Sequence, residues 1–471
     1  LQNCGIFQVM KPKKGAEITL KIDSLVYGGS GIGQVDGYKV FVDGVAPGDS
    51  VRAQMKKART SYGEGRLLQI LEPSPLRIQA RCKHFGVCGG CKWQFLDYGE
   101  QCKVKEQQVK DAMERIGGLG KGDSASPSVV KPLIPNREPW FYRNKMELSF
   151  GTSPDGKVML GFYPTGYHYE VFDVEECFLQ SELLVEIVKK VRDFAKEFRV
   201  PVYNSHTHEG LLRTLTVREG KNTGEVMVIL TTSTSVFDHK EAFAKLFEGD
   251  ERITSLYWNT VYQVPGHPTW QEENLLAGKE VLTEALILEN GQRLEFDILP
   301  QAFFQTNTKQ AEVLYSKVVE LAGLSGEEVV FDLYCGTGTI GLFCAHKARH
   351  IYGIEVNEAA VESARGNASK NKIENATFFL GSVEERLAEL KEKPDVLIVD
   401  PPRAGLEGDV VEKCAAFGAD KIVYVSCNPS TLARDLKAFT GLGYAIITVQ
   451  PVDMFPQTHH TECVTLLEKN A

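Results

Sequence analysis

The chain has 471 residues, a length that predicts two to four domains, and its 43% hydrophobic and 24% charged residues are typical of a globular protein. Its longest apolar stretches have the length of strands and lie between charged residues, which argues against a membrane-spanning helix or a signal peptide. We therefore expect a cytoplasmic monomer. Eleven cysteines, an odd number, argue against a disulfide framework and for reduced thiols with separate roles.

The net charge of −9 is unevenly distributed along the chain. Residues 1–150 carry 23 Lys and Arg against 15 Asp and Glu, whereas residues 151–471 carry 30 against 47. A basic N-terminal third suits a polyanionic partner that binds at one end of the protein. A lysine-rich solvated surface explains the asymmetry equally well.

Residues 11–73 predict a small β-barrel, because short apolar strands alternate there with glycine-rich turns and five strands fit the length. Such barrels often bind oligonucleotides. The stretch "KKARTSYGEGR" offers an aromatic ring beside basic side chains, namely Lys56, Lys57, Arg59, Tyr62 and Arg66. The segment resembles a TRAM domain, an RNA-binding module that is appended to several RNA-modifying enzymes.

Three cysteines follow the barrel with the spacing Cys82-x5-Cys88-x2-Cys91. Tight glycine turns between them allow the sulfurs to converge on one centre, and thiolates suit either zinc or an iron–sulfur cluster. Three ligands leave such a site one ligand short. Spacing does not rank the cysteines that could complete it, which are Cys4, Cys102 and Cys177.

The middle of the chain combines several strand patterns with one amphipathic helix, residues 181–198. We therefore expect residues 74–290 to form a sheet-rich central domain that recognises RNA and carries the metal site. It remains open at this point whether residues 93–120 pack on the domain that follows.

From about residue 291 strands alternate with helices, which predicts a doubly wound α/β domain over residues 291–471. The turn Gly336-x-Gly338-x-x-Gly341 matches the Rossmann fingerprint, and the next strand ends in Glu355, placed to bind ribose hydroxyls. These features do not separate NAD from S-adenosylmethionine. The stretch "PDVLIVDPPRAGL" favours the latter, because methyltransferases commonly place an acid such as Asp400 and two prolines at the end of a strand.

Cys427 ends the next strand, so we expect its thiol at the same edge of the sheet. Pro429 marks the start of a helix, with Ser430 and Thr431 as candidate caps, and a helix N-terminus favours a thiolate. Beside a methyl donor, a thiolate can add to C6 of uracil and make C5 nucleophilic. A general base must then remove the C5 proton, and Glu462 in the last strand is the candidate.

Five motifs together, "QAFFQTN", "DLYCGTGTIG", "DPPRAGL", "SCNPSTLARDL" and "HHTEC", resemble the bacterial RNA uracil-5 methyltransferases, especially the iron–sulfur-containing branch that acts on 23S ribosomal RNA. The resemblance implies a Rossmann-like domain that uses S-adenosylmethionine, preceded by an OB-like TRAM barrel and a central domain with a [4Fe–4S] cluster. It makes Cys427 the nucleophile and Glu462 the base. It also assigns the residues around the cofactor, Gln305, Tyr334, Glu355 and Asp400, and the cluster ligands, Cys82, Cys88, Cys91 and Cys177.

Three alternatives stay open at this stage. Transfer RNA is a possible substrate in place of ribosomal RNA. A redox or radical enzyme would use the cluster directly, although the x5 spacing and a fourth cysteine differ from the usual C-x3-C-x2-C setting with an open iron. A non-catalytic RNA-binding protein is the third, and it should have lost Cys427, Glu462 or the glycine turn.

Overall fold

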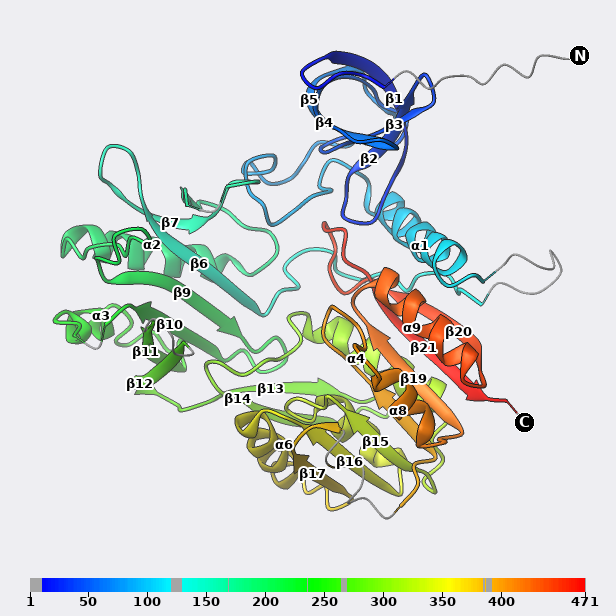
Figure 1. The fold of residues 1–471 in the computed structure, drawn as a ribbon. Helices are drawn as coiled ribbons and strands as arrows, with labels where there is room; N and C mark the ends of the chain where they lie inside the picture. The colour runs from blue at the N-terminus through cyan, green and yellow to red at the C-terminus, as the bar shows by residue number, and fades with distance from the viewer. Residues whose placement is uncertain are drawn as a thin grey trace, which may run out of the picture.

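The computed structural model describes residues 11–119, 129–167, 169–234, 236–263, 269–383, 386 and 392–470. Its elements form three successive parts: a small barrel, a central sheet with two helices, and a C-terminal α/β unit (Figure 1). No described helix is both long and apolar enough to cross a lipid bilayer.

The N-terminal part is the expected five-stranded barrel. Its strands are β1 (Glu17–Leu25), β2 (Gly31–Val35), β3 (Tyr38–Val42), β4 (Ser50–Ala58) and β5 (Tyr62–Glu72). They close in the order β1-β2-β3-β5-β4, with β3 and β5 parallel and the other pairs antiparallel. Side chains alternate between the interior and solvent along β1, where Ile18, Leu20 and Ile22 are buried, so the hydrophobic alternation in the sequence produces the barrel core.

The central part is a seven-stranded sheet. Its strands are β6 (Lys145–Thr152), β7 (Val158–Phe162), β8 (Phe172–Asp173), β9 (Leu212–Glu219), β10 (Val226–Thr232), β11 (Ser255–Tyr262) and β12 (Trp270–Gly278), arranged β12-β11-β10-β9-β6-β7-β8. All pairs are antiparallel except β10–β11. The expected amphipathic helix is α2 (Glu182–Glu197), whose apolar stripe is buried in the core of this part, and a short helix, α3 (Lys240–Lys245), lies beside it.

The C-terminal part is a second seven-stranded sheet with helices. Its strands are β15 (Val329–Leu333), β16 (His350–Glu355), β17 (Ala376–Leu380), β18 (Val396–Val399), β19 (Lys421–Ser426), β20 (Tyr444–Val452) and β21 (Glu462–Lys469). Their order is β17-β16-β15-β18-β19-β21-β20. The first five are parallel, whereas β21 is antiparallel to both neighbours. The helices are α4 (Thr308–Ala322), α5 (Thr339–Cys344), the 3-10 turn η1 (Ala345–Lys347), α6 (Glu358–Lys370), α8 (Val410–Ala416) and α9 (Pro429–Gly441).

Two further elements link the parts. Helix α1 (Tyr98–Arg115) follows the barrel in sequence, yet it packs against α9 of the C-terminal part. Its fully buried Lys105 lies 2.6 Å from the carboxylate of Asp453, which is also fully buried. The hairpin of β13 (Leu282–Ile287) and β14 (Arg293–Ile298) lies on both sides of residue 291, and its apolar residues share one core with α4 and β15.

Candidate active site

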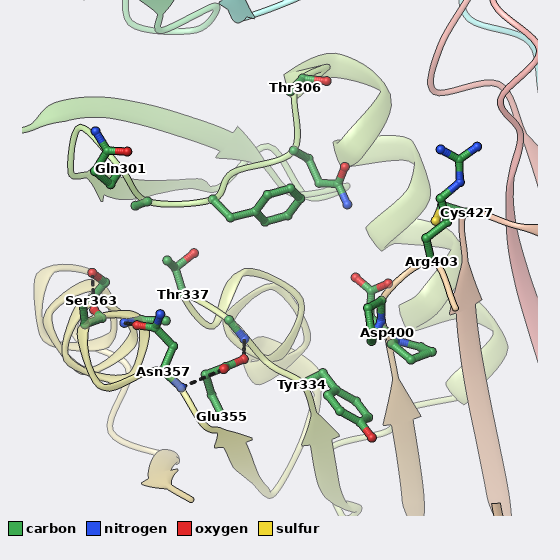
Figure 2. A pocket seen from close by; sticks show the side chains of 18 of the residues that line it. Gln301, Thr306, Tyr334, Thr337, Glu355, Asn357, Ser363, Asp400, Arg403 and Cys427 are labelled. Carbon is green, nitrogen blue, oxygen red and sulfur yellow. Dashed lines mark hydrogen bonds between the residues drawn. The ribbon is translucent and has the colours of Figure 1, made fainter. Parts of the chain in front are cut away.

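A cavity of about 1070 Å³ lies at the carboxyl ends of the parallel strands. It is lined by all six residues that the sequence analysis assigned to the reaction and its cofactor, Gln305, Tyr334, Glu355, Asp400, Cys427 and Glu462. Figure 2 shows the cavity, with Glu355 and Asn357 on one side and Arg403 and Cys427 on the other. The volume is at the upper end of the range for small-molecule sites, and it suits a cofactor together with part of a second substrate.

The glycine turn after β15 forms one wall of this cavity through Tyr334, Gly336 and Thr337. Gly338 has a φ of 77°, which side chains rarely adopt, and a Cβ on it would lie 3.0 Å from both Ala364 and Phe378, so a larger residue would be strained there. Tyr334, which lines the cavity, has a φ of 62°, an uncommon conformation for a residue with a side chain. The glycine motif therefore lets α6 and β17 pack closely beneath the turn.

Glu355 joins two loops at the end of β16. Its carboxylate accepts hydrogen bonds from the main-chain N–H of Gly336 (3.1 Å) and from that of Asn357 (2.9 Å), as the dashed lines in Figure 2 show. These bonds hold the carboxylate at the edge of the sheet, where an acid can bind vicinal hydroxyls.

Asp400 follows β18 and lies between the two ends of the cavity (Figure 2). Burial raises the pKa of its carboxyl group to about 7. Pro401 and Pro402 after it also line the cavity and fix the direction of the chain.

Cys427 follows β19 and lies two residues before the start of α9. The cap of α9 is Asn428, whose side chain accepts a hydrogen bond from the N–H of Ser430 (3.0 Å), so the expectation that Ser430 or Thr431 caps the helix is wrong. Burial, together with the charges of Glu462 and Asp400, raises the pKa of the Cys427 thiol to about 11. The expected preference for thiolate at this helix end is therefore outweighed by burial and by nearby carboxylates.

Glu462 is the first residue of β21 and is 5% exposed. Burial first, and then the charge of Asp400, raise the pKa of its carboxyl group to about 8, whereas Arg403 lowers it. Three acidic groups that line the cavity, Asp400, Cys427 and Glu462, therefore oppose each other's ionisation.

Sequence reasoning missed Arg403 and His460, which also line the cavity. The Arg403 guanidinium lies 3.3 Å from Nδ1 of His460. Burial, with a further effect of Arg403, lowers the pKa of His460 to about 4, so Arg403 is the cation of this pair. Arg403 directly follows the two prolines at the strand end, and that position was the signal that could have identified it.

A second cavity, of about 290 Å³, lies in the central part and is called here the cysteine cavity. It is lined by four cysteines, Cys82, Cys88, Cys91 and Cys177. The loop of residues 82–91 is held there by backbone bonds, from Gly89 N to Tyr163 O (3.3 Å) and from Thr165 N to Val87 O (2.8 Å). The main-chain N–H of Lys83 donates to the carboxylate of Glu176.

Of the three candidates for a fourth ligand, the structure describes two, Cys102 and Cys177. Cys177 lines the cysteine cavity, whereas Cys102 lies on α1 and does not line it. Cys4 lies outside the described residues. Within the described ranges, no three His, Cys, Asp or Glu side chains are grouped closely enough to hold a single metal ion. The four thiols surround a space and do not meet at one point.

The order of the C-terminal strands, the glycine turn and the acids at the strand ends define a methyltransferase fold that uses S-adenosylmethionine. A family model described as tRNA (Uracil-5-)-methyltransferase matches residues 269–470, and the TRAM domain model matches residues 11–68.

The similarity to known proteins extends over nearly the whole chain. An uncharacterized RNA methyltransferase of Clostridium tetani is 39% identical over 97% of this chain and 97% of its own. One of Caldanaerobacter subterraneus is 38% identical over 97% of this chain and 100% of its own. The crystal structure of Pyrococcus abyssi tRNA (uracil-54, C5)-methyltransferase with S-adenosyl-L-homocysteine has a TM-score of 0.75 and 30% identity, over 95% of this chain and 100% of that one.

The chain belongs to the RNA (uracil-5-)-methyltransferase family. It is an S-adenosylmethionine-dependent RNA methyltransferase with an N-terminal TRAM domain, and RNA is its partner.

Proposed function

We propose that this enzyme methylates C5 of a uridine in 23S ribosomal RNA through a covalent adduct between Cys427 and C6 of the base. The observation that carries the proposal is that Cys427, Glu462 and Asp400 line one cavity. Glu355 lies on the opposite side of this cavity from Cys427 (Figure 2).

Cys427 and Glu462 have separate roles in the proposed reaction. The Cys427 sulfur bonds to C6, and the electron pair of the C5–C6 double bond moves towards the O4 carbonyl, so that C5 becomes nucleophilic. S-Adenosylmethionine supplies the methyl group that C5 takes up. The Glu462 carboxylate then removes the C5 proton, the double bond forms again, and the Cys427 thiolate leaves.

Both groups must lose a proton before they act, although their pKa values are raised in the free protein. Arg403 lowers both values, so its charge favours the ionised forms. A positively charged cofactor beside Asp400 would act in the same direction.

For the cofactor we propose four residues. Glu355 holds the ribose hydroxyls, because its carboxylate is fixed between two loops. Tyr334 and Gln305 line the cavity beside the adenosine and methionine portions, and Asp400 faces the reacting end.

Transfer RNA is the second candidate substrate. It is favoured by one observation, namely that the Pyrococcus abyssi protein with 30% identity is a tRNA (uracil-54, C5)-methyltransferase. The motifs quoted from this sequence favour the ribosomal RNA branch, and so does the combination of a TRAM barrel with four cysteines around one cavity.

We further propose that Cys82, Cys88, Cys91 and Cys177 hold a [4Fe–4S] cluster. Such a cluster takes one thiolate on each iron, so its ligands surround a space, as these four cysteines do. The lining also includes apolar side chains such as Phe85, Met146 and Phe162. Four ligands leave no open iron, which favours a structural role over a radical one.

Mapping of 5-methyluridine tests this proposal. Ribosomal and transfer RNA from a deletion strain, with and without the restored gene, should differ at one or a few uridines of 23S RNA, each of which regains its methyl group on complementation. A difference confined to transfer RNA would establish the second candidate, and no difference in either RNA would contradict both. We expect this activity in the cytoplasm, where both RNAs occur.

A further inference from the structure

The TRAM barrel contacts the turn that carries Cys427 through the loop that joins β1 and β2, residues 26–30. The hydroxyl of Tyr27 in this loop donates a hydrogen bond to the main-chain oxygen of Cys427 (3.4 Å). Its ring contacts the ring of His459 edge to face, with centroids 5.9 Å apart. A residue 400 positions before the proposed nucleophile therefore contacts the turn that carries it.

The loop is held firmly in this place. Lys92 donates to the oxygen of Gly28 (2.8 Å), the indole N–H of Trp93 donates to that of Gly29 (3.3 Å), and Gln108 of α1 donates to that of Leu25 (3.1 Å). Trp93 is fully buried, in a small core that also contains Leu25. The loop is thus part of a packed interface and not a free end of the barrel.

The loop contains a glycine in the left-handed backbone region. Gly29 has a φ of 93°, and a Cβ at this position would lie 2.9 Å from Cδ of Lys92 and 3.5 Å from Cβ of His459. A side chain there would be strained by this backbone conformation and would displace the side chain of Lys92.

Tyr27 also lies beside Arg403. Burial raises the pKa of the Tyr27 hydroxyl, whereas a hydrogen bond with Arg403 and the charge of Arg403 lower it. The charges of Cys427 and Glu462 also raise the pKa of this hydroxyl. Tyr27 is therefore in contact with the cation that favours ionisation of both groups and with the main chain of the nucleophile.

We infer that the barrel loop of residues 26–30 is a component of the catalytic centre, in which Tyr27 positions Arg403 and the Cys427 turn. The inference rests on the proposed roles of Cys427 and Glu462. It gives the barrel a second role besides RNA binding, because the same small domain that contacts RNA also shapes the reaction site.

The Tyr27→Phe variant tests this, since it keeps the ring and removes the hydroxyl. We expect kcat at saturating RNA to fall about tenfold, with the KM for RNA within about twofold of the original value. Because Arg403 would lose a partner that holds it near Cys427 and Glu462, the rise of kcat with pH should also move to higher pH. Tyr27→Leu, which loses the ring as well, should lower kcat further.

The matched control is Tyr444→Phe, whose hydroxyl likewise donates to a main-chain oxygen, that of Ala419 (2.9 Å), but at the opposite end of β19. We expect it to lower stability without moving the pH profile.

Unchanged kcat and pH profile in Tyr27→Phe would overturn the inference, and so would a loss of RNA affinity at unchanged kcat. Cys427→Ala, measured in parallel, keeps the two proposals apart. Activity in that variant contradicts the proposed mechanism, whereas inactive Cys427→Ala beside fully active Tyr27→Phe contradicts the role of Tyr27 alone.

Discussion

The two cavities described above both have cysteine in their lining, but the thiols are placed for different tasks. The larger cavity holds the candidate active site and is called here the main cavity. In it one thiol, Cys427, lies among carboxyl groups at the edge of a parallel sheet. In the cysteine cavity four thiols, three from the loop of residues 82–91 and one from Cys177, surround a small space. A single thiol beside a base can act as a nucleophile, whereas four around a space can hold a cluster that ties two segments together.

The largest effect should come from Cys427→Ala. Because Cys427 is the only cysteine among the described residues that line this cavity, we expect methyl transfer from labelled cofactor to fall by about 10³-fold or more, while cofactor binding stays near normal. Cys344→Ala is the control, since Cys344 is fully buried on α5 and does not line the cavity. Substantial activity in Cys427→Ala would show that the main cavity does not use covalent chemistry.

Glu462→Gln should reduce turnover by about 10²- to 10⁴-fold, because the variant lacks the base that removes the C5 proton. This step follows addition of Cys427 and methyl transfer. We expect a methylated covalent protein–RNA adduct to accumulate and to migrate slowly on a denaturing gel. If turnover stays intact and no adduct appears, another group removes the C5 proton.

In the cysteine cavity, Cys88→Ser should lower the melting temperature of the protein or reduce its affinity for RNA about tenfold. The reason is that a cluster that links residues 82–91 to Cys177 contributes to folding. Cys102→Ser on α1 is the control, since that thiol lies outside this cavity. A Cys88 variant that folds and binds RNA normally but no longer transfers methyl groups would point to a direct catalytic role.

The last expected difference between the two cavities concerns pH, which should affect catalysis but not RNA binding. Cys427 and Glu462 both act only when ionised, and their pKa values are raised to about 11 and about 8, so kcat/KM should rise with pH between pH 6 and pH 9, and less steeply above pH 8, where Glu462 is already ionised. RNA binding by the part around the cysteine cavity should show no such rise. A flat kcat/KM between pH 6 and pH 9 would contradict the role assigned to Glu462.

Much of the main cavity could be predicted because its residues follow sheet strands. Tyr334, Glu355, Asp400 and Cys427 all lie at the carboxyl ends of parallel strands, which meet at one edge whatever the loops do. The barrel and helix α2 could be predicted for a similar reason, because alternation and helical periodicity are local properties of the sequence.

The remaining features depend on contacts between distant segments. No local pattern indicates that Tyr27 reaches Cys427, or that Cys177 lines the same cavity as Cys82. The ionisation of Cys427 could not be read from its helix either, because burial and two carboxylates oppose the effect of the helix end.

RNA that contains 5-fluorouridine at the target position tests the central claim most directly. Fluorine cannot leave C5 as a proton does, so the reaction should stop after methyl transfer with the enzyme still bonded to C6. We predict that mass spectrometry of the digested complex will find the methylated fluoropyrimidine on the peptide that carries Cys427, and that the adduct will form only when S-adenosylmethionine is present. An adduct on another residue, or full turnover without any adduct, would contradict the account.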